Sequence, residues 1–129
     1  RHLISAMKSR GIKRIITLTG SGVPDRHNDG FSLIDRFVSF GMQNLAGRAI
    51  RQRFNDGVHY ARILIEEKDL DWTIVRAPVL NQLPARGRYK VGYVGRLWGY
   101  FLSREDLADF ILKEMESGNY IKSRPFITN

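Results

Sequence analysis

The segment Trp72–Pro78 constrains the fold of this chain more than any other stretch. Its aromatic and β-branched residues are typical of a strand that is buried on both faces, and the proline at its end predicts a loop. Ahead of this segment, apolar residues recur at helical spacing, at Val58, Ala61, Ile63, Leu64 and Ile65. A helix that leads into a buried strand is half of a parallel crossover unit.

The N-terminal part of the chain shows the same order of elements. Leu3, Ile4 and Met7 predict the last turns of an amphipathic helix, and Gly11 is the expected stop just beyond its end. The run Arg14–Thr19 is apolar and β-branched, which predicts a second strand covered on both faces. The sequence after it is rich in glycine, proline, aspartate and asparagine, which predicts a loop at the carboxyl end of this strand.

Two helices are expected between these strands. Ser32 and Asp35 have the spacing of a capping box and predict a helix that starts near them. Arg48–Asn55 is polar and arginine-rich, so we interpret it as a connection between helices. Asp56 is then expected to cap the helix that leads to Trp72.

The C-terminal third predicts one helix between irregular segments. Ser103 and Asp106 form a second capping box, and Gly118 is the expected stop of the helix that follows. Residues 79–102 predict turns with one short edge strand. A last short strand is expected at Phe126–Thr128, after a proline.

The alternation of strands and helices predicts an α/β protein with a doubly wound parallel sheet. Three strands are few for this architecture, and the chain begins inside a predicted helix. We therefore expect residues 1–129 to be a single domain that forms the C-terminal part of a larger doubly wound unit.

The composition bears on three questions: binding to nucleic acid, spanning of a membrane and location in the cell. The chain has 21 basic and 13 acidic residues, for a net charge of +8, but the basic residues are spread along it and no nucleic-acid motif accompanies them. We therefore expect no nucleic-acid partner. The apolar runs are far shorter than the roughly 20 residues that cross a bilayer, so no membrane span is predicted. The absence of cysteine fits a reducing compartment, and the cytoplasm is the expected location.

Three blocks of sequence, the first of them in two parts, carry a family resemblance. Gly11–Ile16, Thr19–Gly22, Leu70–Pro78 and Ser103–Phe110 occur in the order found in atypical short-chain dehydrogenases. Within that class, the chain is most similar to the NAD(P)H-binding group that includes NmrA-like proteins and biliverdin/flavin reductases. The resemblance implies a Rossmann-type fold, NADP or NAD as cofactor, and hydride transfer to a small molecule of the flavin, quinone or carbonyl type.

The chain departs from this family in its phosphate-binding loop. A glycine-rich loop after the first strand normally holds the pyrophosphate with its backbone N–H groups. Gly20-Ser21-Gly22 follows a strand but lacks the third glycine. In the usual layout of such domains, on the order of 70 to 80 residues carrying that loop would precede Arg1.

A second departure concerns proton transfer. Many members of the superfamily use a Tyr-x-x-x-Lys pair, in which the lysine lowers the tyrosine pKa. No tyrosine of this chain has a lysine four residues later, and Tyr60, for example, is followed by Leu64. Two alternatives therefore stay open: a reductase whose acceptor takes its proton from solvent or a looser donor, and a non-catalytic NmrA-like sensor that binds the dinucleotide and regulates a partner.

The candidate site lies where the two predicted strands end, because open α/β sheets bind ligands at their carboxyl edge. The resemblance places these segments beside the nicotinamide. Ordinary hydroxyl capping of a strand end is the alternative for the first segment, and a surface salt bridge is the alternative for the arginine of the second. The candidate cofactor-binding residues are Thr19, Gly20, Ser21, Arg76, Ala77 and Pro78.

His59 and Tyr60 are the candidate catalytic residues, because they lie where the family carries its catalytic-position helix. A histidine titrates near neutrality, with an unperturbed pKa of about 6.5, and can donate a proton. A solvated histidine on a helix surface is the alternative. His2 and His27 lie apart from it and no cysteine is present, so the sequence predicts no metal site. The oligomeric state is not indicated by the sequence.

Overall fold

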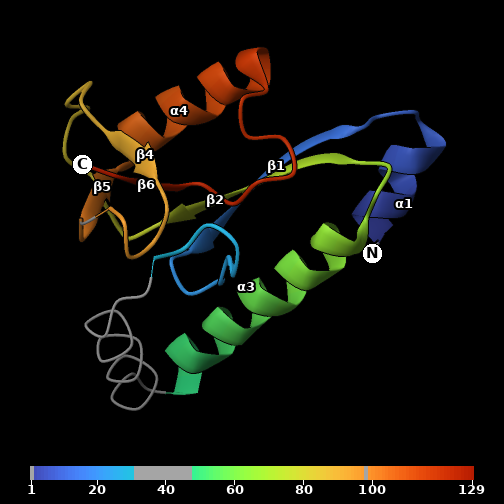
Figure 1. The fold of residues 1–129 in the computed structure, drawn as a ribbon, viewed down its shortest axis with the longest axis horizontal. Coiled ribbons are helices and arrows are strands. Elements are labelled where there is room, and N and C mark those ends of the chain that lie inside the picture. The colour runs from blue at the N-terminus through green and yellow to red at the C-terminus, as the bar shows by residue number, and fades with distance from the viewer. Residues whose placement is uncertain (1, 31–47, 98) are drawn as a thin grey trace.

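The computed structural model describes residues 2–30, 48–97 and 99–129 (Figure 1). The predicted helix near Ser32 and Asp35 lies outside these residues. The elements are α1 (His2–Ser9), β1 (Arg14–Gly20), α3 (Arg48–Glu66), β2 (Asp71–Ala77), β3 (Val79–Asn81), β4 (Lys90–Gly92), β5 (Phe101–Ser103), α4 (Arg104–Ser117) and β6 (Phe126–Thr128).

The main sheet has the strand order β1-β2-β6-β4. β1, β2 and β6 are parallel, and β4 runs antiparallel to β6. β3 and β5 form a separate two-stranded parallel sheet. The predicted α/β class with a mainly parallel sheet is therefore confirmed. Residues 79–102 are less irregular than predicted, since β3 and β4 both lie within them.

The two predicted buried strands differ in their surroundings. In β2, every residue after Asp71 is buried. In β1, only Thr19 is buried and the Leu18 side chain is 44% exposed, which differs from the prediction of a strand covered on both faces. The physical reason is position, because β1 lies at one edge of the sheet formed by the described residues.

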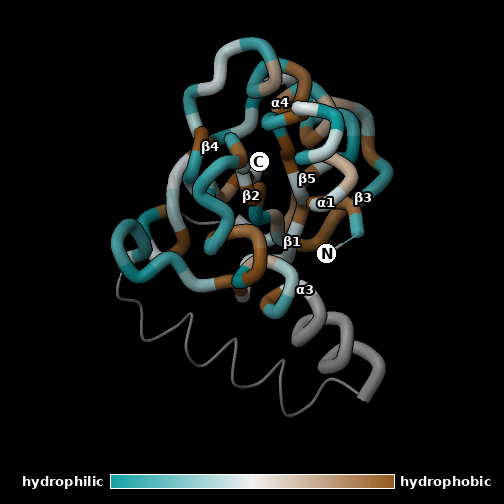
Figure 2. The backbone as a smooth tube through the Cα atoms, turned by 90° about the vertical axis from the view of Figure 1, so that its right-hand side faces the viewer, coloured by the Kyte–Doolittle hydropathy of each residue, from teal (hydrophilic) through white to brown (hydrophobic). Residues whose placement is uncertain are grey.

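Helices cover both faces of the sheet. α1 and α3 lie on one side of the strands and α4 on the other (Figure 1). Successive β2 side chains point to opposite faces. Trp72 and Ile74 therefore pack in a core with α1 and α3, whereas Val75 and Ala77 pack in a second core with α4. Figure 2 shows that hydrophobic stretches gather in the central strands and hydrophilic ones in the outer loops.

α3 begins earlier than the sequence analysis predicted. Arg48–Asn55 is the first part of the helix and not a connection, and Asp56 lies inside the helix and not at its cap. The prediction was wrong because it treated polar residues as a sign of a loop. Arginine, glutamine and alanine have high helix propensities, so a polar run of this composition continues a helix readily.

α4 has the ends that the sequence predicted. The Ser103 hydroxyl accepts a hydrogen bond from the Asp106 N–H at 3.0 Å, and Gly118 has the left-handed φ of 63° that ends the helix. The buried Asp106 carboxylate also accepts the backbone N–H groups of Arg86 and Gly87, both at 3.0 Å. The cap therefore also fixes the loop that precedes β4.

Replacement of Asp106 tests this double role. In Asp106→Asn, an amide NH₂ takes the place of one carboxylate oxygen, so one of the two backbone N–H donors, that of Arg86 or that of Gly87, loses its acceptor. We expect the free energy of unfolding to fall by about 1–3 kcal/mol at neutral pH, measured by urea unfolding. Glu116→Gln, at an exposed position of the same helix, is the control and should stay near the wild-type value. Equal stability of the two variants would contradict this role of Asp106.

Within the described ranges, no helix combines the length and the hydropathy that a membrane span requires.

Candidate functional site

The carboxyl ends of β1 and β2 lie side by side. Thr19 is paired with Arg76, and Gly20 is paired with Ala77. The structure thus brings together the strand-end residues that the sequence analysis selected, at the edge where α/β sheets bind ligands.

The Thr19 hydroxyl is the most informative polar group at this edge. The Thr19 side chain is buried, and its Oγ1 has no hydrogen-bond partner among the residues described. A buried hydroxyl without a partner costs about 1–3 kcal/mol, so such groups are uncommon unless something binds them. Thr17, two residues deeper in β1, carries a second hydroxyl of this kind.

The backbone beyond Thr19 is open. A Cβ atom built at Gly20 would meet no atom within 4 Å among the residues described, and Ser21 is exposed. A ligand can therefore approach the backbone at the end of β1 closely. An unsatisfied hydroxyl beside open backbone fits a dinucleotide cofactor, whose carboxamide and ribose groups offer donors and acceptors.

The Arg76 side chain is buried within the protein and is bound by protein groups. It is 0% exposed, and both Nη atoms donate to the Asp29 carboxylate at 2.7 Å. Nη1 also donates to the Val23 carbonyl at 3.0 Å, and Nε donates to the Arg124 carbonyl at 2.8 Å. The expected alternative of a surface salt bridge is wrong, because this ion pair has a fully buried arginine.

A second ion pair supports the first. Arg124 Nη2 donates to Asp25 Oδ1 at 2.8 Å, and the Asp25 N–H donates to Asp29 Oδ2 at 2.6 Å. Burial of Asp25 acts to raise the pKa of its carboxyl. The hydrogen bond from Asn28 and the nearby Arg124 outweigh burial, so the pKa of Asp25 lies below its ordinary value.

The lowered pKa of Asp25 makes the loop sensitive to acid. Ionised Asp25 stabilises the fold above the unfolded-state pKa of about 3.9, and this contribution disappears as the pH falls through the lower folded-state pKa. The free energy of unfolding of Asp25→Asn should therefore depend less on pH below about pH 4 than that of the wild type. Urea unfolding at a series of pH values measures it.

Asp69→Asn is the matched control for this measurement, because the Asp69 side chain is 81% exposed. It should keep the acid dependence of the wild type. If Asp25→Asn also kept it, the Asp25 carboxylate would not stabilise the fold as described.

Beyond β2 the chain presents an apolar surface. Ala77 is buried and Pro78 is half-buried. Val79 of β3 pairs with Phe101 of β5, and these two side chains are 58% and 57% exposed. Together with the neighbouring Tyr100, which is also exposed, they give the segment after the strand end an apolar and aromatic character.

The candidate catalytic residues lie on α3. His59 is exposed, whereas Tyr60 is half-buried and packs against the core between α1, α3 and β2. Burial raises the pKa of the Tyr60 phenol. Tyr60 therefore keeps its proton at neutral pH and can act as a hydrogen-bond donor but not as a base. Catalytic roles for His59 and Tyr60 stay predictions.

The residues that anchor the loop after β1 were not predicted from the sequence. Asp25, Asp29 and Arg124 are part of its ion-pair network, but Arg124 is 99 positions from Asp25 in sequence. The available signal was weak: two aspartates in a loop that directly follows a predicted buried strand.

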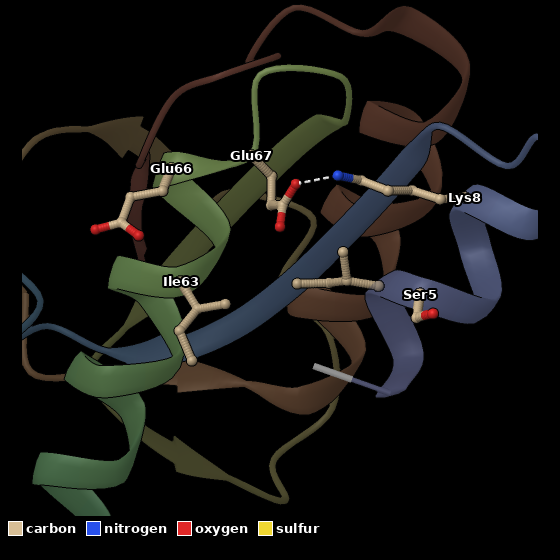
Figure 3. A pocket seen from close by; sticks show the side chains of 6 residues that line it. Ser5, Lys8, Ile63, Glu66 and Glu67 are labelled. Carbon is tan, nitrogen blue, oxygen red and sulfur yellow. Dashed lines mark ion pairs between the residues drawn. The ribbon is translucent and has the colours of Figure 1, made fainter.

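An open pocket of about 400 Å³ lies elsewhere, between α1 and the last turns of α3 (Figure 3). Lys8 and Glu67 form an ion pair at 2.6 Å beside it. Since Glu66 and Glu67 lie just ahead of β2, this pocket is at the amino ends of the strands and not at the edge expected for ligands. Its lining residues are Ile4, Ser5, Lys8, Ile63, Glu66 and Glu67.

The comparisons with known proteins assign the family. The sequence profile of the NAD(P)H-binding family matches residues 1–117. The chain therefore belongs to this NAD(P)H-binding family, and NADP or NAD as the cofactor class is confirmed. The resemblance to atypical short-chain dehydrogenases is confirmed at this level. No sequence among the curated proteins matches the chain.

Several solved structures share the fold. A short-chain dehydrogenase/reductase from Veillonella parvula, in complex with NADP, has a TM-score of 0.68 and 17% identity, over 98% of this chain and 55% of its own. ChuY, an anaerobillin reductase from Escherichia coli O157:H7, has a TM-score of 0.64 and 19% identity, over 98% and 54%. The oxidoreductase YlbE from Lactococcus lactis has a TM-score of 0.71 and 18% identity, over 98% and 51%. The chain thus spans about half the length of these structures.

Proposed function

We propose that residues 1–129 form the nicotinamide- and acceptor-facing part of an NAD(P)H-dependent oxidoreductase of the atypical short-chain type. The observation that carries this proposal is the buried Thr19 hydroxyl at the carboxyl edge of a parallel sheet, which has no partner among the described residues, in a chain of an NAD(P)H-binding family. The described reductase and dehydrogenase neighbours support the same class of reaction.

The strand ends have distinct roles in this proposal. The cofactor, when bound, supplies the hydride. The Thr19 hydroxyl exchanges a hydrogen bond with the cofactor, and Gly20 and Ser21 allow it to lie close to the backbone. Ala77 and Pro78 border it on the β2 side by backbone contacts.

The acceptor is proposed to be a small flavin-, quinone- or carbonyl-type molecule. The exposed Val79 and Phe101 side chains, which follow the end of β2, offer an apolar surface for a flat ring. The chain has no Tyr-x-x-x-Lys pair. Such an acceptor suits this chain, because it can take its proton from solvent or from a loosely placed donor.

The pyrophosphate requires residues outside this part of the fold. No glycine-rich strand-to-helix turn is present in the sequence, and β1 has a free edge in the described sheet. We therefore propose that this chain acts with further residues that complete a Rossmann domain. Residues 1–129 alone should not bind NADPH tightly in a fluorescence titration, and saturable, tight binding by them alone would contradict this part of the proposal.

Turnover distinguishes the reductase from the alternative function, a non-catalytic redox sensor. The protein that contains this chain should oxidise NADPH in the presence of a flavin or a quinone, measured by the loss of nicotinamide absorbance. An NmrA-like redox sensor is the second candidate, favoured by the missing Tyr-x-x-x-Lys pair. Tight, preferential binding of the oxidised dinucleotide without turnover on any acceptor would establish the sensor and refute the reductase.

The Thr19 hydroxyl can be tested separately from the reaction. Thr19→Val keeps the shape of the side chain and removes the unpaired hydroxyl. We expect the dissociation constant for NADPH to rise about three- to tenfold, the value of one hydrogen bond. Without cofactor, the stability should stay equal or rise, because a buried hydroxyl without a partner is lost.

Thr17→Val is the matched control, since Thr17 carries a similar hydroxyl on the same face of β1 but two residues deeper in the strand than Thr19. It should leave NADPH binding unchanged. Equal affinities of the wild type and Thr19→Val would exclude the proposed contact.

A further inference from the structure

We infer that Arg76 is a positioning residue of the cofactor site, which holds the loop after β1 in place through Asp29 and Val23 and makes no contact with a cofactor phosphate. The inference rests on the proposed function and concerns the loop of residues 21–30. An arginine at a strand end would ordinarily be assigned to binding an anionic ligand. Here its role is to hold a loop in place.

The hydrogen bonds of Arg76 leave little capacity for a ligand. A guanidinium has five N–H donors. Four of them are accounted for by the two Asp29 oxygens, the Val23 carbonyl and the Arg124 carbonyl. The side chain is also completely buried. A phosphate could reach Arg76 only by displacing the Asp29 carboxylate.

The loop is held at several successive residues. Arg76 binds Val23 and Asp29, and Arg124 Nη1 donates to the Pro24 carbonyl at 2.8 Å. Arg124 Nη2 binds Asp25, and the Arg124 carbonyl accepts from Arg76 Nε. The two arginines thus bind each other and the same loop. Their planar, forked geometry fixes the direction as well as the length of these contacts.

The position of this loop determines the position of the proposed cofactor contacts. Gly20 and Ser21 directly precede it, and the Val23 N–H donates to the Gly20 carbonyl at 3.5 Å. Val23 is anchored twice, by its carbonyl to Arg76 and by its side chain in the core with α1 and α3. Loss of the Arg76–Asp29 pair should therefore displace the backbone at Gly20 and Ser21. Each hydrogen bond to a ligand that is lost when the backbone is displaced lowers the affinity about three- to tenfold.

A second buried ion pair provides a matched control. Arg14, the first residue of β1, donates to Glu114 Oε1 at 2.7 Å, and the Glu114 side chain is 1% exposed. Both are arginine–carboxylate pairs with contacts of 2.7 Å, but Arg76 binds both carboxylate oxygens of Asp29, whereas Arg14 binds one carboxylate oxygen of Glu114. The Arg14–Glu114 pair lies at the amino end of β1, roughly 20 Å from the carboxyl end for a strand of this length.

The test compares Asp29→Asn with Glu114→Gln in the full-length protein. Each variant leaves an arginine facing a neutral amide, so both should lose stability. At a temperature where circular dichroism shows both to be folded, we expect Asp29→Asn to raise the dissociation constant for NADPH about tenfold or more. Glu114→Gln should stay within about twofold of the wild type.

The sign of the effect separates positioning from direct contact. If Arg76 bound a cofactor phosphate, Asp29→Asn would free its positive charge, and NADPH would bind as tightly or more tightly. Arg76→Lys gives a second comparison, because it keeps the positive charge but loses the planar guanidinium group that binds both Asp29 oxygens. The inference expects Arg76→Lys to weaken binding about as much as Asp29→Asn, whereas retained affinity in Arg76→Lys would overturn it.

Two further outcomes are decisive. If Asp29→Asn does not fold, Arg124→Lys loosens the same loop from its more exposed anchor, 17% exposed, and should weaken NADPH binding by a smaller factor. Equal affinities in Arg124→Lys and Glu114→Gln would then overturn the inference.

If the wild-type protein binds no NADPH, the proposed function fails and this inference with it. If the wild type binds but Asp29→Asn and Glu114→Gln behave alike, only the inference fails.

Discussion

The parallel pairing of β1 with β2 is the interaction on which the rest of the structure depends. Seven consecutive residue pairs set the register of the two strands. This register places Thr19 beside Arg76 and Gly20 beside Ala77, and it directs the Arg76 side chain toward the loop after β1. A slip of one residue would turn each β2 side chain to the opposite face. Arg76 would then point into the apolar core beneath α4, and the loop would lose its anchor.

The sequence predicted those parts of the fold that local signals determine. The strand ahead of Pro78, the stop at Gly11 and both ends of α4 depend on residues within a few positions of one another. The start of α3 was wrong because arginine-rich helices and arginine-rich loops have similar compositions. Packing against the rest of the fold decides whether such a segment forms a helix or a loop.

The candidate site was predictable in its position but not in its internal contacts. A general rule for parallel sheets was enough to select Thr19 and Ala77. The partner of Arg76 could not be predicted from the sequence, because Asp29 lies 47 residues away and any of the 13 acidic residues could have formed that pair. Nor could the sequence indicate that the Thr19 hydroxyl has no partner among the described residues, since that depends on what packs around β1.

Within residues 2–30, 48–97 and 99–129, the outer edge of β1 pairs with no other strand, which matters for the behaviour of this chain in solution. An exposed strand edge carries unpaired N–H and C=O groups and is a template for strands of other molecules. β1 is rich in β-branched residues, its Leu18 side chain is exposed, and no proline interrupts it. Where nothing covers this edge, two copies can join by intermolecular strand addition. The same backbone N–H and C=O groups would be satisfied by a neighbouring strand of a larger sheet.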